Sequence, residues 1–336
     1  MILRSLAILL LCLSVALAWA WQDYQIFIAQ PIVSQEPVII DIEKGSSFRS
    51  IIQLLDSQIG FQRPEIDKLW FKVLARQQGL INQLKAGEYL LDVGMTPYEF
   101  LILLSSGKTL QHSITIPEGW TFKQIRQALV ADKNLMLTLT GISDADILKK
   151  IGSDYTQPEG LFFPDTYIFT KHTTDLVILQ QAYQKMQQVL SEQWSNKSAG
   201  LPLKNVYEAL ILASIVEKET AVPSERPAIA GVFIRRLNKG MRLQTDPTVI
   251  YGMGESYQGN ISKKDLQTFT PYNTYRIKGL PPTPIAMPGM EAINAVLHPA
   301  EGKSLYFVAN GDGSHVFSAT LLEHNRAVNT FQRKQH

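Results

Sequence analysis

The stretch VIIDIEKGSSFRSIIQLL (Val38 to Leu55) combines three local signals in order. Apolar residues first alternate with polar ones, Gly45 then marks a turn, and Ser47 is suited to cap a helix whose apolar residues recur at helical spacing. A second copy follows in SITIPEGWTFKQIRQAL (Ser113 to Leu129). The aligned pairs are Ile40 and Ile114, Ile42 and Ile116, Gly45 and Gly119, Ser47 and Thr121, Phe48 and Phe122, Ile51 and Ile125, and Leu55 and Leu129. A strand, turn and helix used twice predict an α+β fold.

Further elements lie between the two copies. The sequence predicts a helix near Ile66 to Gln78, a strand at Gly87 to Val93 and a helix capped by Thr96, with Pro97 in its first turn. Residues 37–108 thus form a compact subdomain near the lower size limit for independent folding. This subdomain resembles a LysM-like module, a small fold associated with glycan binding. The alternative is a subdomain that serves only for packing or spacing.

Residues 109–336 have the pattern of a larger mixed domain. Helices are predicted at Asp175 to Trp194, Asn205 to Thr220, Pro227 to Leu237 and Met290 to Val296, and short strands at Ser304 to Asn310 and His315 to Ala319. The irregular stretch TPYNTYRIKGLPPTPIAMPGM (Thr270 to Met290) precedes the last helix. Such a stretch inside a folded domain is uncommon unless it lines a site, so we expect substrate contacts there.

The N-terminal segment is apolar. An uncharged run of about 17 residues from Ser5 to Trp21 would reach roughly 25 Å as a helix, just enough to span a bilayer with help from flanking residues. We predict a transmembrane anchor over residues 1–22 and a tether over residues 23–36. Trp19 and Trp21 are typical of a membrane interface, and Arg4 favours a cytoplasmic N-terminus, so the chain is expected to be a single-pass protein of the cytoplasmic (inner) membrane with its remainder on the periplasmic or external side. The alternative is a signal peptide, because small residues flank Trp19 at the spacing of a cleavage site.

The composition argues against several classes of protein. With 336 residues, of which 45% are hydrophobic and 18% charged, the chain is long enough for one large or two modest domains. The net charge of +2, without a long Lys or Arg run, predicts no nucleic-acid partner. The only cysteine, Cys12, lies in the apolar N-terminal segment, and His298, His315 and His324 lack metal-ligand spacing. We therefore expect no metal site and no cofactor.

The stretch ILASIVEKETAVPSERP (Ile211 to Pro227) ends an apolar helix in two carboxylates. Glu219 continues the bulky apolar stripe of this helix, whereas Glu217 continues a smaller and more polar one. Pro223 ends the helix within a turn. The negative end of the helix dipole and the apolar neighbours oppose ionisation, so the pKa of both carboxyls should rise. A carboxylic acid that is still protonated near neutral pH suits protonation of a glycosidic oxygen, and the alternative is simple pairing with a cation such as Arg226.

Several longer motifs follow one another along the chain. They are EGLFFPDTY (Glu159 to Tyr167), ASIVEKET (Ala213 to Thr220), RLQTDPTVIYG (Arg242 to Gly252), YNTY (Tyr272 to Tyr275) and GLPPTPIAMPG (Gly279 to Gly289). With these motifs the chain resembles the YceG-like family, the endolytic murein transglycosylases. The resemblance covers essentially the whole chain.

The resemblance implies a membrane-anchored lyase that cuts within nascent peptidoglycan glycan strands, between N-acetylmuramic acid and N-acetylglucosamine. It leaves 1,6-anhydromuramic acid ends and limits strand elongation, in cooperation with peptidoglycan synthases (penicillin-binding proteins). The essential acid of the family lies in the EKET segment, which we assign to Glu219, with Glu217 as the second choice. One carboxyl is enough, because the C6 hydroxyl of the muramic acid is the nucleophile and one Glu can act first as acid and then as base.

Two alternatives stay open from the residues. A muramidase that hydrolyses the same bond needs a second carboxylate, for which Asp246 is the candidate, although it is equally a turn residue before Pro247. A non-catalytic scaffold would only bind glycan. Sugars require flat apolar faces and hydroxyl partners, and the predicted contacts are Thr220, Gln244, Asp246, Tyr251, Tyr272, Asn273 and Tyr275. Phe162 and Phe163 are expected in the core, and Glu159 and Asp165 are further candidate acids of the cleft.

Overall fold

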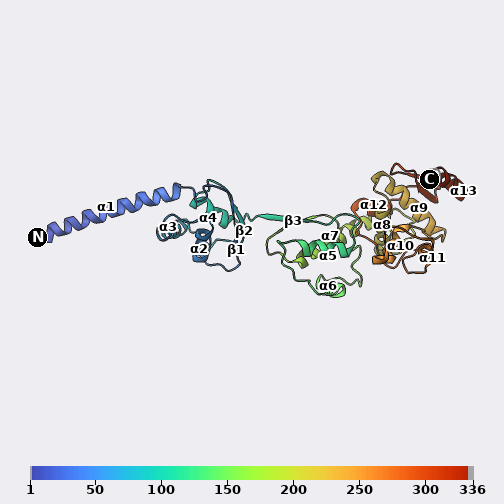
Figure 1. The fold of residues 1–336 in the computed structure, drawn as a ribbon, viewed down its shortest axis with the longest axis horizontal. Coiled ribbons are helices and arrows are strands. Elements are labelled where there is room, and N and C mark those ends of the chain that lie inside the picture. The colour runs from blue at the N-terminus through green and yellow to red at the C-terminus, as the bar shows by residue number, and fades with distance from the viewer. Residues whose placement is uncertain (1, 332–336) are drawn as a thin grey trace. The chain divides into compact units, whose positions relative to one another are not determined.

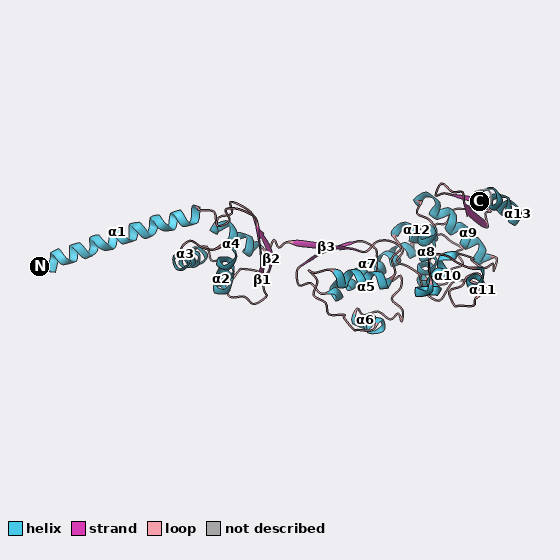
Figure 2. Cartoon of the chain, viewed as in Figure 1, coloured by secondary structure: helices cyan, strands magenta, loops and turns pink. Residues whose placement is uncertain are grey.

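The computed structural model describes residues 2–331 and divides the chain into two compact units (Figure 1). Unit 1 comprises the residues up to His112 together with Phe169–His172, and unit 2 comprises Ser113–Ile168 and the residues from Thr173 onward. Helices dominate both units and the strands form small sheets (Figure 2). The α+β class predicted from the sequence is confirmed.

Unit 1 contains α1 (Ile2–Ala29), β1 (Val38–Ile42), α2 (Phe48–Ile59), α3 (Pro64–Gln77), β2 (Gly87–Leu91) and α4 (Pro97–Ser106). β1 and β2 are antiparallel, with Ile40 opposite Tyr89. The predicted caps are present, because the Ser47 side chain accepts a hydrogen bond from Ser50 and Thr96 forms a capping box with Glu99. The core is built from the apolar faces of these elements and includes Ile40, Leu55, Phe71, Tyr89, Leu91, Phe100 and Leu104.

Helix α1 extends further than the predicted anchor. Leu3–Ala29 is long and apolar enough to cross a membrane. Its last turns are packed within unit 1: Tyr24 and Phe27 are buried, and Asp23 accepts hydrogen bonds from Arg63 at 2.5 Å and Trp70 at 2.7 Å. The first part of the expected tether, residues 23–29, is therefore the end of a packed helix, because Tyr24 and Phe27 give it a buried apolar face.

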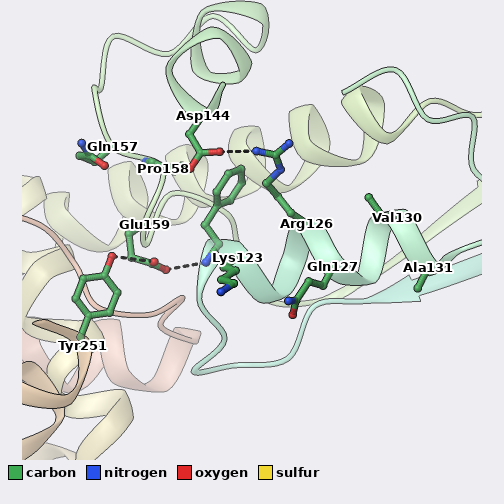
Figure 3. A pocket seen from close by; sticks show the side chains of 11 residues that line it. Lys123, Arg126, Gln127, Val130, Ala131, Asp144, Gln157, Pro158, Glu159 and Tyr251 are labelled. Carbon is green, nitrogen blue, oxygen red and sulfur yellow. Dashed lines mark hydrogen bonds and ion pairs between the residues drawn. The ribbon is translucent and has the colours of Figure 1, made fainter. Parts of the chain in front are cut away.

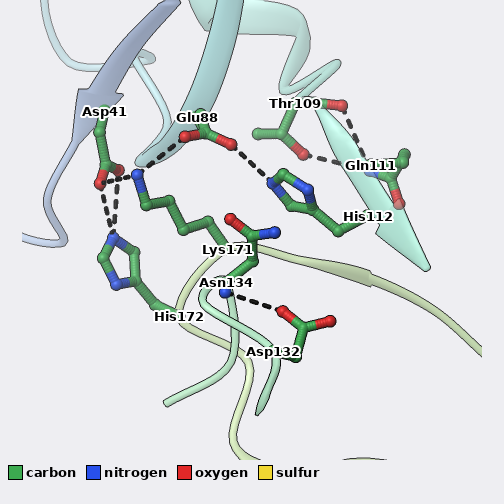
Figure 4. Close-up of polar contacts among 9 residues, drawn as sticks. All are labelled: Asp41, Glu88, Thr109, Gln111, His112, Asp132, Asn134, Lys171 and His172. Carbon is green, nitrogen blue, oxygen red and sulfur yellow. Dashed lines mark hydrogen bonds and ion pairs between the residues drawn. The ribbon is translucent and has the colours of Figure 1, made fainter. Parts of the chain in front are cut away.

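Strands β3 (Gln111–Thr115) and β4 (Thr166–Thr170) form a second two-stranded sheet, and the boundary between the units falls within both strands. Asp41 and Glu88 lie opposite each other in the β1 and β2 register, where like charges repel. Lys171 contacts both, at 3.1 and 2.8 Å, while His172 and His112 pair with Asp41 and Glu88, respectively (Figure 4). The segment after β4 is thereby held to the sheet of unit 1.

Unit 2 is mainly helical. Its elements are α5 (Phe122–Ala131), α6 (Asp144–Lys150), α7 (Asp175–Ser195), α8 (Val206–Glu219), η1 (Pro223–Glu225), α9 (Arg226–Asn238), α10 (Asp246–Met253), η2 (Gly254–Ser256), α11 (Lys263–Gln267), α12 (Met290–Leu297), β5 (Tyr306–Ala309), β6 (His315–Ser318) and α13 (Leu321–Phe331). All eight residues from Ala209 to Val216 are buried, so α8 is apolar all round and forms the centre of the unit. Helices α7, α9, α10 and α12 pack around it. The four helices and two strands predicted for this half are confirmed.

The two copies of the strand, turn and helix lie in different units. The first forms β1 and α2 in unit 1, and the second begins in β3 and continues as α5 in unit 2. Both turns need a glycine, since Gly45 and Gly119 have φ angles of 90° and 74°. Four of the five aligned apolar pairs are buried in both copies, namely Ile40 and Ile114, Ile42 and Ile116, Ile51 and Ile125, and Leu55 and Leu129.

Candidate active site

The candidate acid lies where the central helix ends. Helix α8 stops at Glu219, and its C-cap Thr220 has extended backbone angles. The carboxyl of Glu219 accepts a hydrogen bond from the Thr245 hydroxyl. It lines a cavity of about 570 Å³, referred to here as the Glu219 cavity, together with residues of α9, α10, α13 and the β5 and β6 hairpin. The lining includes Arg236, Gln244, Thr245, Asp246, Tyr275, Tyr306, His315 and His324.

Burial raises the pKa of Glu219 to about 7, and the negative charge of Asp246 adds to this effect. The Thr245 hydrogen bond opposes it, because a hydroxyl donor stabilises the carboxylate. The upward shift of the Glu219 pKa agrees with the sequence-based expectation. A carboxyl with a pKa raised toward neutral pH can act both as a proton donor and as a proton acceptor.

Glu217 has a different environment. It pairs with Arg226 at 3.0 Å and accepts a hydrogen bond from the Gly289 amide at 3.0 Å. Both side chains of this ion pair are less than 10% exposed, and Arg226 also contacts Glu291. Positions two apart on a helix point about 200° apart, so the two glutamates face different sides of α8. Glu217 thus connects the end of α8 to Arg226 at the start of α9 and to Gly289 just before α12, whereas Glu219 lines a cavity.

Thr245 was not singled out in the sequence. It occupies the N-cap of α10, yet its side chain makes no capping hydrogen bond to the helix. Its amide donates to the Thr274 hydroxyl at 3.1 Å, and that hydroxyl lies 2.9 Å from the hydroxyl of Thr248. The preceding Gln244 has a φ of 53°, a left-handed conformation that a non-glycine residue rarely adopts. These contacts hold the loop so that the Thr245 hydroxyl points to Glu219. The sequence showed only a threonine at the start of a helix, which does not indicate this role.

Three of the predicted glycan contacts line the Glu219 cavity. Gln244 and Asp246 are exposed there, and the Tyr275 hydroxyl donates to Asp246 at 2.7 Å. Asp246 begins α10, and among residues 2–331 it and Glu219 are the two carboxyl side chains on this cavity. The structure therefore brings together the acid, the second carboxylate candidate and one aromatic ring.

The other four predicted contacts do not line this cavity. Thr220 is buried and accepts a hydrogen bond from the Val222 amide, and the Asn273 amide group donates to three backbone carbonyls. Tyr272 bonds with Thr283, while Tyr251 donates to Glu159 elsewhere in unit 2. Residues 283–289 of the irregular stretch are buried, so the second half of this stretch packs in the interior, and its first half contributes Tyr275 to the cavity.

Two of the histidines that lack metal-ligand spacing also border the cavity. His315 and His324 line it, and His315 Nδ1 lies 2.6 Å from the Glu225 carboxyl. Arg236 is buried and donates to the carbonyls of Leu305 and Leu243, each at 2.6 Å. Among residues 2–331, no group of three or more His, Cys, Asp and Glu side chains has an arrangement that would hold a metal ion.

Thr245→Val tests the coupling of the hydroxyl to the acid. Because the hydrogen bond lowers the pKa of Glu219, its loss is expected to raise that pKa by about one unit. The limb of the pH–rate profile that falls above about pH 7 should move to higher pH by the same amount. Thr245→Ser, which retains a hydroxyl, is the matched control. An unchanged limb in the valine variant would contradict the coupling.

A carboxyl with a raised pKa on a polar cavity has the properties that acid–base catalysis requires, and comparison with known proteins gives the family of the chain. Residues 40–330 match the model of the YceG-like family. The chain is 33% identical over 316 residues to the endolytic murein transglycosylase of Bacillus subtilis, covering 88% of this chain and 84% of that protein. It is 31% identical to the endolytic murein transglycosylase of Streptococcus pneumoniae, covering 88% of this chain and 58% of that longer protein.

A solved structure is also similar. The 2.6 Å crystal structure of a YceG-like protein from Listeria monocytogenes has a TM-score of 0.53 and 31% sequence identity, covering 87% of this chain and 99% of that chain. The chain belongs to the YceG-like family.

Proposed function

We propose that this protein is an endolytic peptidoglycan lytic transglycosylase in which Glu219 is the acid and then the base. The observation that carries the proposal is the Glu219 carboxyl, which has a pKa near 7, ends the central helix and lines a cavity. Family membership supports the substrate, since the relatives are named murein transglycosylases. The bond cleaved is the one between N-acetylmuramic acid and N-acetylglucosamine within nascent strands, and its cleavage limits strand elongation.

The reaction needs one carboxyl. Protonated Glu219 gives its proton to the glycosidic oxygen as the bond from that oxygen to the muramic C1 breaks. The C6 hydroxyl of the same muramic acid then bonds to C1, and the Glu219 carboxylate takes the hydroxyl proton. The products are a strand with a free 4-hydroxyl and a strand with a 1,6-anhydro end. No water is consumed, and the carboxyl returns to its protonated form.

The neighbours of Glu219 suit this cycle. The Thr245 hydroxyl stabilises the carboxylate formed after the first proton transfer, while burial and Asp246 keep the pKa high enough for protonation. Tyr275 offers an aromatic ring to a sugar face, and Gln244 offers an exposed amide to sugar hydroxyls. We assign these side chains to glycan binding in the Glu219 cavity.

Placement at the membrane is part of the proposal. The apolar α1 supports a single-pass anchor, with unit 2 on the periplasmic or external side beside newly made strands. Unit 1 would then lie next to the membrane, where a LysM-like role in glycan binding, or a spacer role, is open to test. Cooperation with peptidoglycan synthases is proposed from the family resemblance.

Mass spectrometry of digested glycan strands tests the proposed reaction. The expected products carry 1,6-anhydromuramic ends, because the internal C6 hydroxyl replaces water. A muramidase using Glu219 and Asp246 would leave only reducing ends and would lose its activity in Asp246→Asn. Reducing ends alone would overturn the lytic route, and a purified wild-type protein that never cleaves would leave the scaffold alternative.

A further inference from the structure

A second cavity of unit 2 takes no part in the function proposed above. It has a volume of about 690 Å³ and lies between α5, the start of α6, the loop 157–159 and α10 (Figure 3). It is referred to here as the Glu159 cavity. Its wall is mostly apolar and includes Phe122, Val130, Ala131, Pro158 and the ring of Tyr251.

Glu159 belongs to the EGLFFPDTY motif, and its carboxyl lies in this cavity. The residue is only 6% exposed, and its carboxyl accepts hydrogen bonds from the Phe122 amide at 2.9 Å and the Tyr251 hydroxyl at 3.0 Å. No cation of the described residues pairs with it, and burial raises its pKa to about 7. The floor of the cavity therefore combines an aromatic ring with a carboxyl that is readily neutral.

The charges at the mouth are already paired. Arg126 contacts Asp144 at 2.7 Å, and Lys123 pairs with Glu255 (Figure 3 shows the first pair). Such a mouth is poorly suited to an anionic ligand, because each cation already has a carboxylate partner. Gln127 and Gln157 are exposed at the cavity, and neither side-chain amide group has a hydrogen-bond partner among residues 2–331.

Free amides above an apolar, aromatic wall match the chemistry of a neutral sugar, which presents hydroxyl and acetamido groups at its edge and C–H groups on its faces. Helix α10 connects the two cavities. Asp246 lines the Glu219 cavity, and Tyr251, five residues later, lines the Glu159 cavity, about 7–8 Å further along the helix axis and about 140° around it. The two side chains therefore face different sides of α10, and a strand of sugars that occupies both cavities passes around this helix.

We propose that the Glu159 cavity is a second glycan subsite, which binds a neutral N-acetylglucosamine ring of the same strand at a distance from the bond that Glu219 cleaves. This inference rests on the proposed function. Its energetic role is to hold long strands, so it contributes to substrate affinity rather than to proton transfer. It gives the enzyme a preference for long strands over short fragments.

The double variant Gln127→Ala/Gln157→Ala tests the subsite, since both side chains are exposed and their removal leaves no buried group unpaired. With long peptide-free glycan strands, KM is expected to rise about tenfold through the loss of two hydrogen bonds, while kcat stays within about twofold. With the shortest fragment that the wild type cleaves, both constants should be unchanged. The matched control is Gln181→Ala/Gln184→Ala on α7, which removes two exposed amides away from both cavities.

The outcomes separate this inference from the proposed function. If Glu219→Gln abolishes cleavage but the Gln127/Gln157 double variant keeps wild-type KM on long strands, the subsite is overturned and the active site stands. A loss confined to strands with peptide stems would assign the cavity to peptide and would also overturn it. If wild-type protein does not cleave, the dissociation constants of long and short strands still test the subsite. The double variant should then bind long strands about tenfold more weakly than wild type and short fragments equally well, and equal binding of long strands would overturn the subsite.

Discussion

Glu219→Gln is expected to lower kcat for glycan cleavage by about 10²–10⁴-fold. A carboxamide has nearly the same shape as the carboxyl and can still accept the Thr245 hydrogen bond, but it cannot give a proton to the glycosidic oxygen or take one from the C6 hydroxyl. KM should change little, since the cavity keeps its size. The rate is measured on purified glycan strands with the full-length variant and full-length wild type, both prepared in the same detergent.

The same variant should be more stable than wild type above neutral pH. The pKa of Glu219 is about 7 in the folded protein and lies near its ordinary value when unfolded. The folded state therefore binds more protons between about pH 4.5 and 7, and the stability linked to this group falls as the pH rises through that window. Removing the ionisation should raise Tm at pH 8 by a few degrees. Inactivity with a raised Tm would separate lost chemistry from lost folding.

Glu217→Gln is expected to reduce stability instead. The substitution removes the charge from a buried ion pair and leaves Arg226 with Glu291 and the more distant Glu118. We expect a loss of about 2–3 kcal/mol, which corresponds to a fall in Tm of roughly 4–12 °C for a unit of this size. At temperatures well below unfolding, kcat should stay within a few-fold of wild type. Calorimetry and the cleavage assay on one sample measure both quantities.

The control for this variant is Glu118→Gln. The Glu118 carboxyl is 46% exposed and lies 3.6 Å from the same guanidinium, so its change should cost less than about 1 kcal/mol. A Glu217→Gln protein with wild-type stability and no cleavage would move the acid from Glu219 to Glu217.

Local signals explain why much of the fold was predictable. Helix caps at Ser47, Thr96 and Thr121, a glycine with positive φ after each strand copy, and apolar periodicity all act within a few residues. The choice of Glu219 over Glu217 also had a local basis, because a stripe of bulky residues leads to Glu219.

Tertiary contacts account for what the sequence did not reveal. The packing of Tyr24 and Phe27 within unit 1 depends on α3 and on the Asp23 bonds to Arg63 and Trp70, which are 40 and 47 residues away. The hydrogen bond from Thr245 to Glu219 joins residues 26 positions apart, and the loop that places Thr245 includes Gln244, which has a positive φ.

Four of the seven predicted sugar contacts lie away from the Glu219 cavity for a related reason. Tyrosine, asparagine and threonine suit both glycan binding and internal hydrogen bonding, and their type does not distinguish the two. In the structure Tyr272 and Asn273 bond to the protein itself, whereas Tyr275 lines the cavity.

Digestion of one glycan strand in water enriched in heavy oxygen tests the central claim most directly. Mass spectra of the wild-type products should show anhydro ends with no heavy oxygen incorporated, and Glu219→Gln should yield no such ends above background. This result follows from a single carboxyl that moves the C6 hydroxyl proton. One heavy oxygen at each new end, or anhydro ends formed at the wild-type rate by Glu219→Gln, would contradict the account.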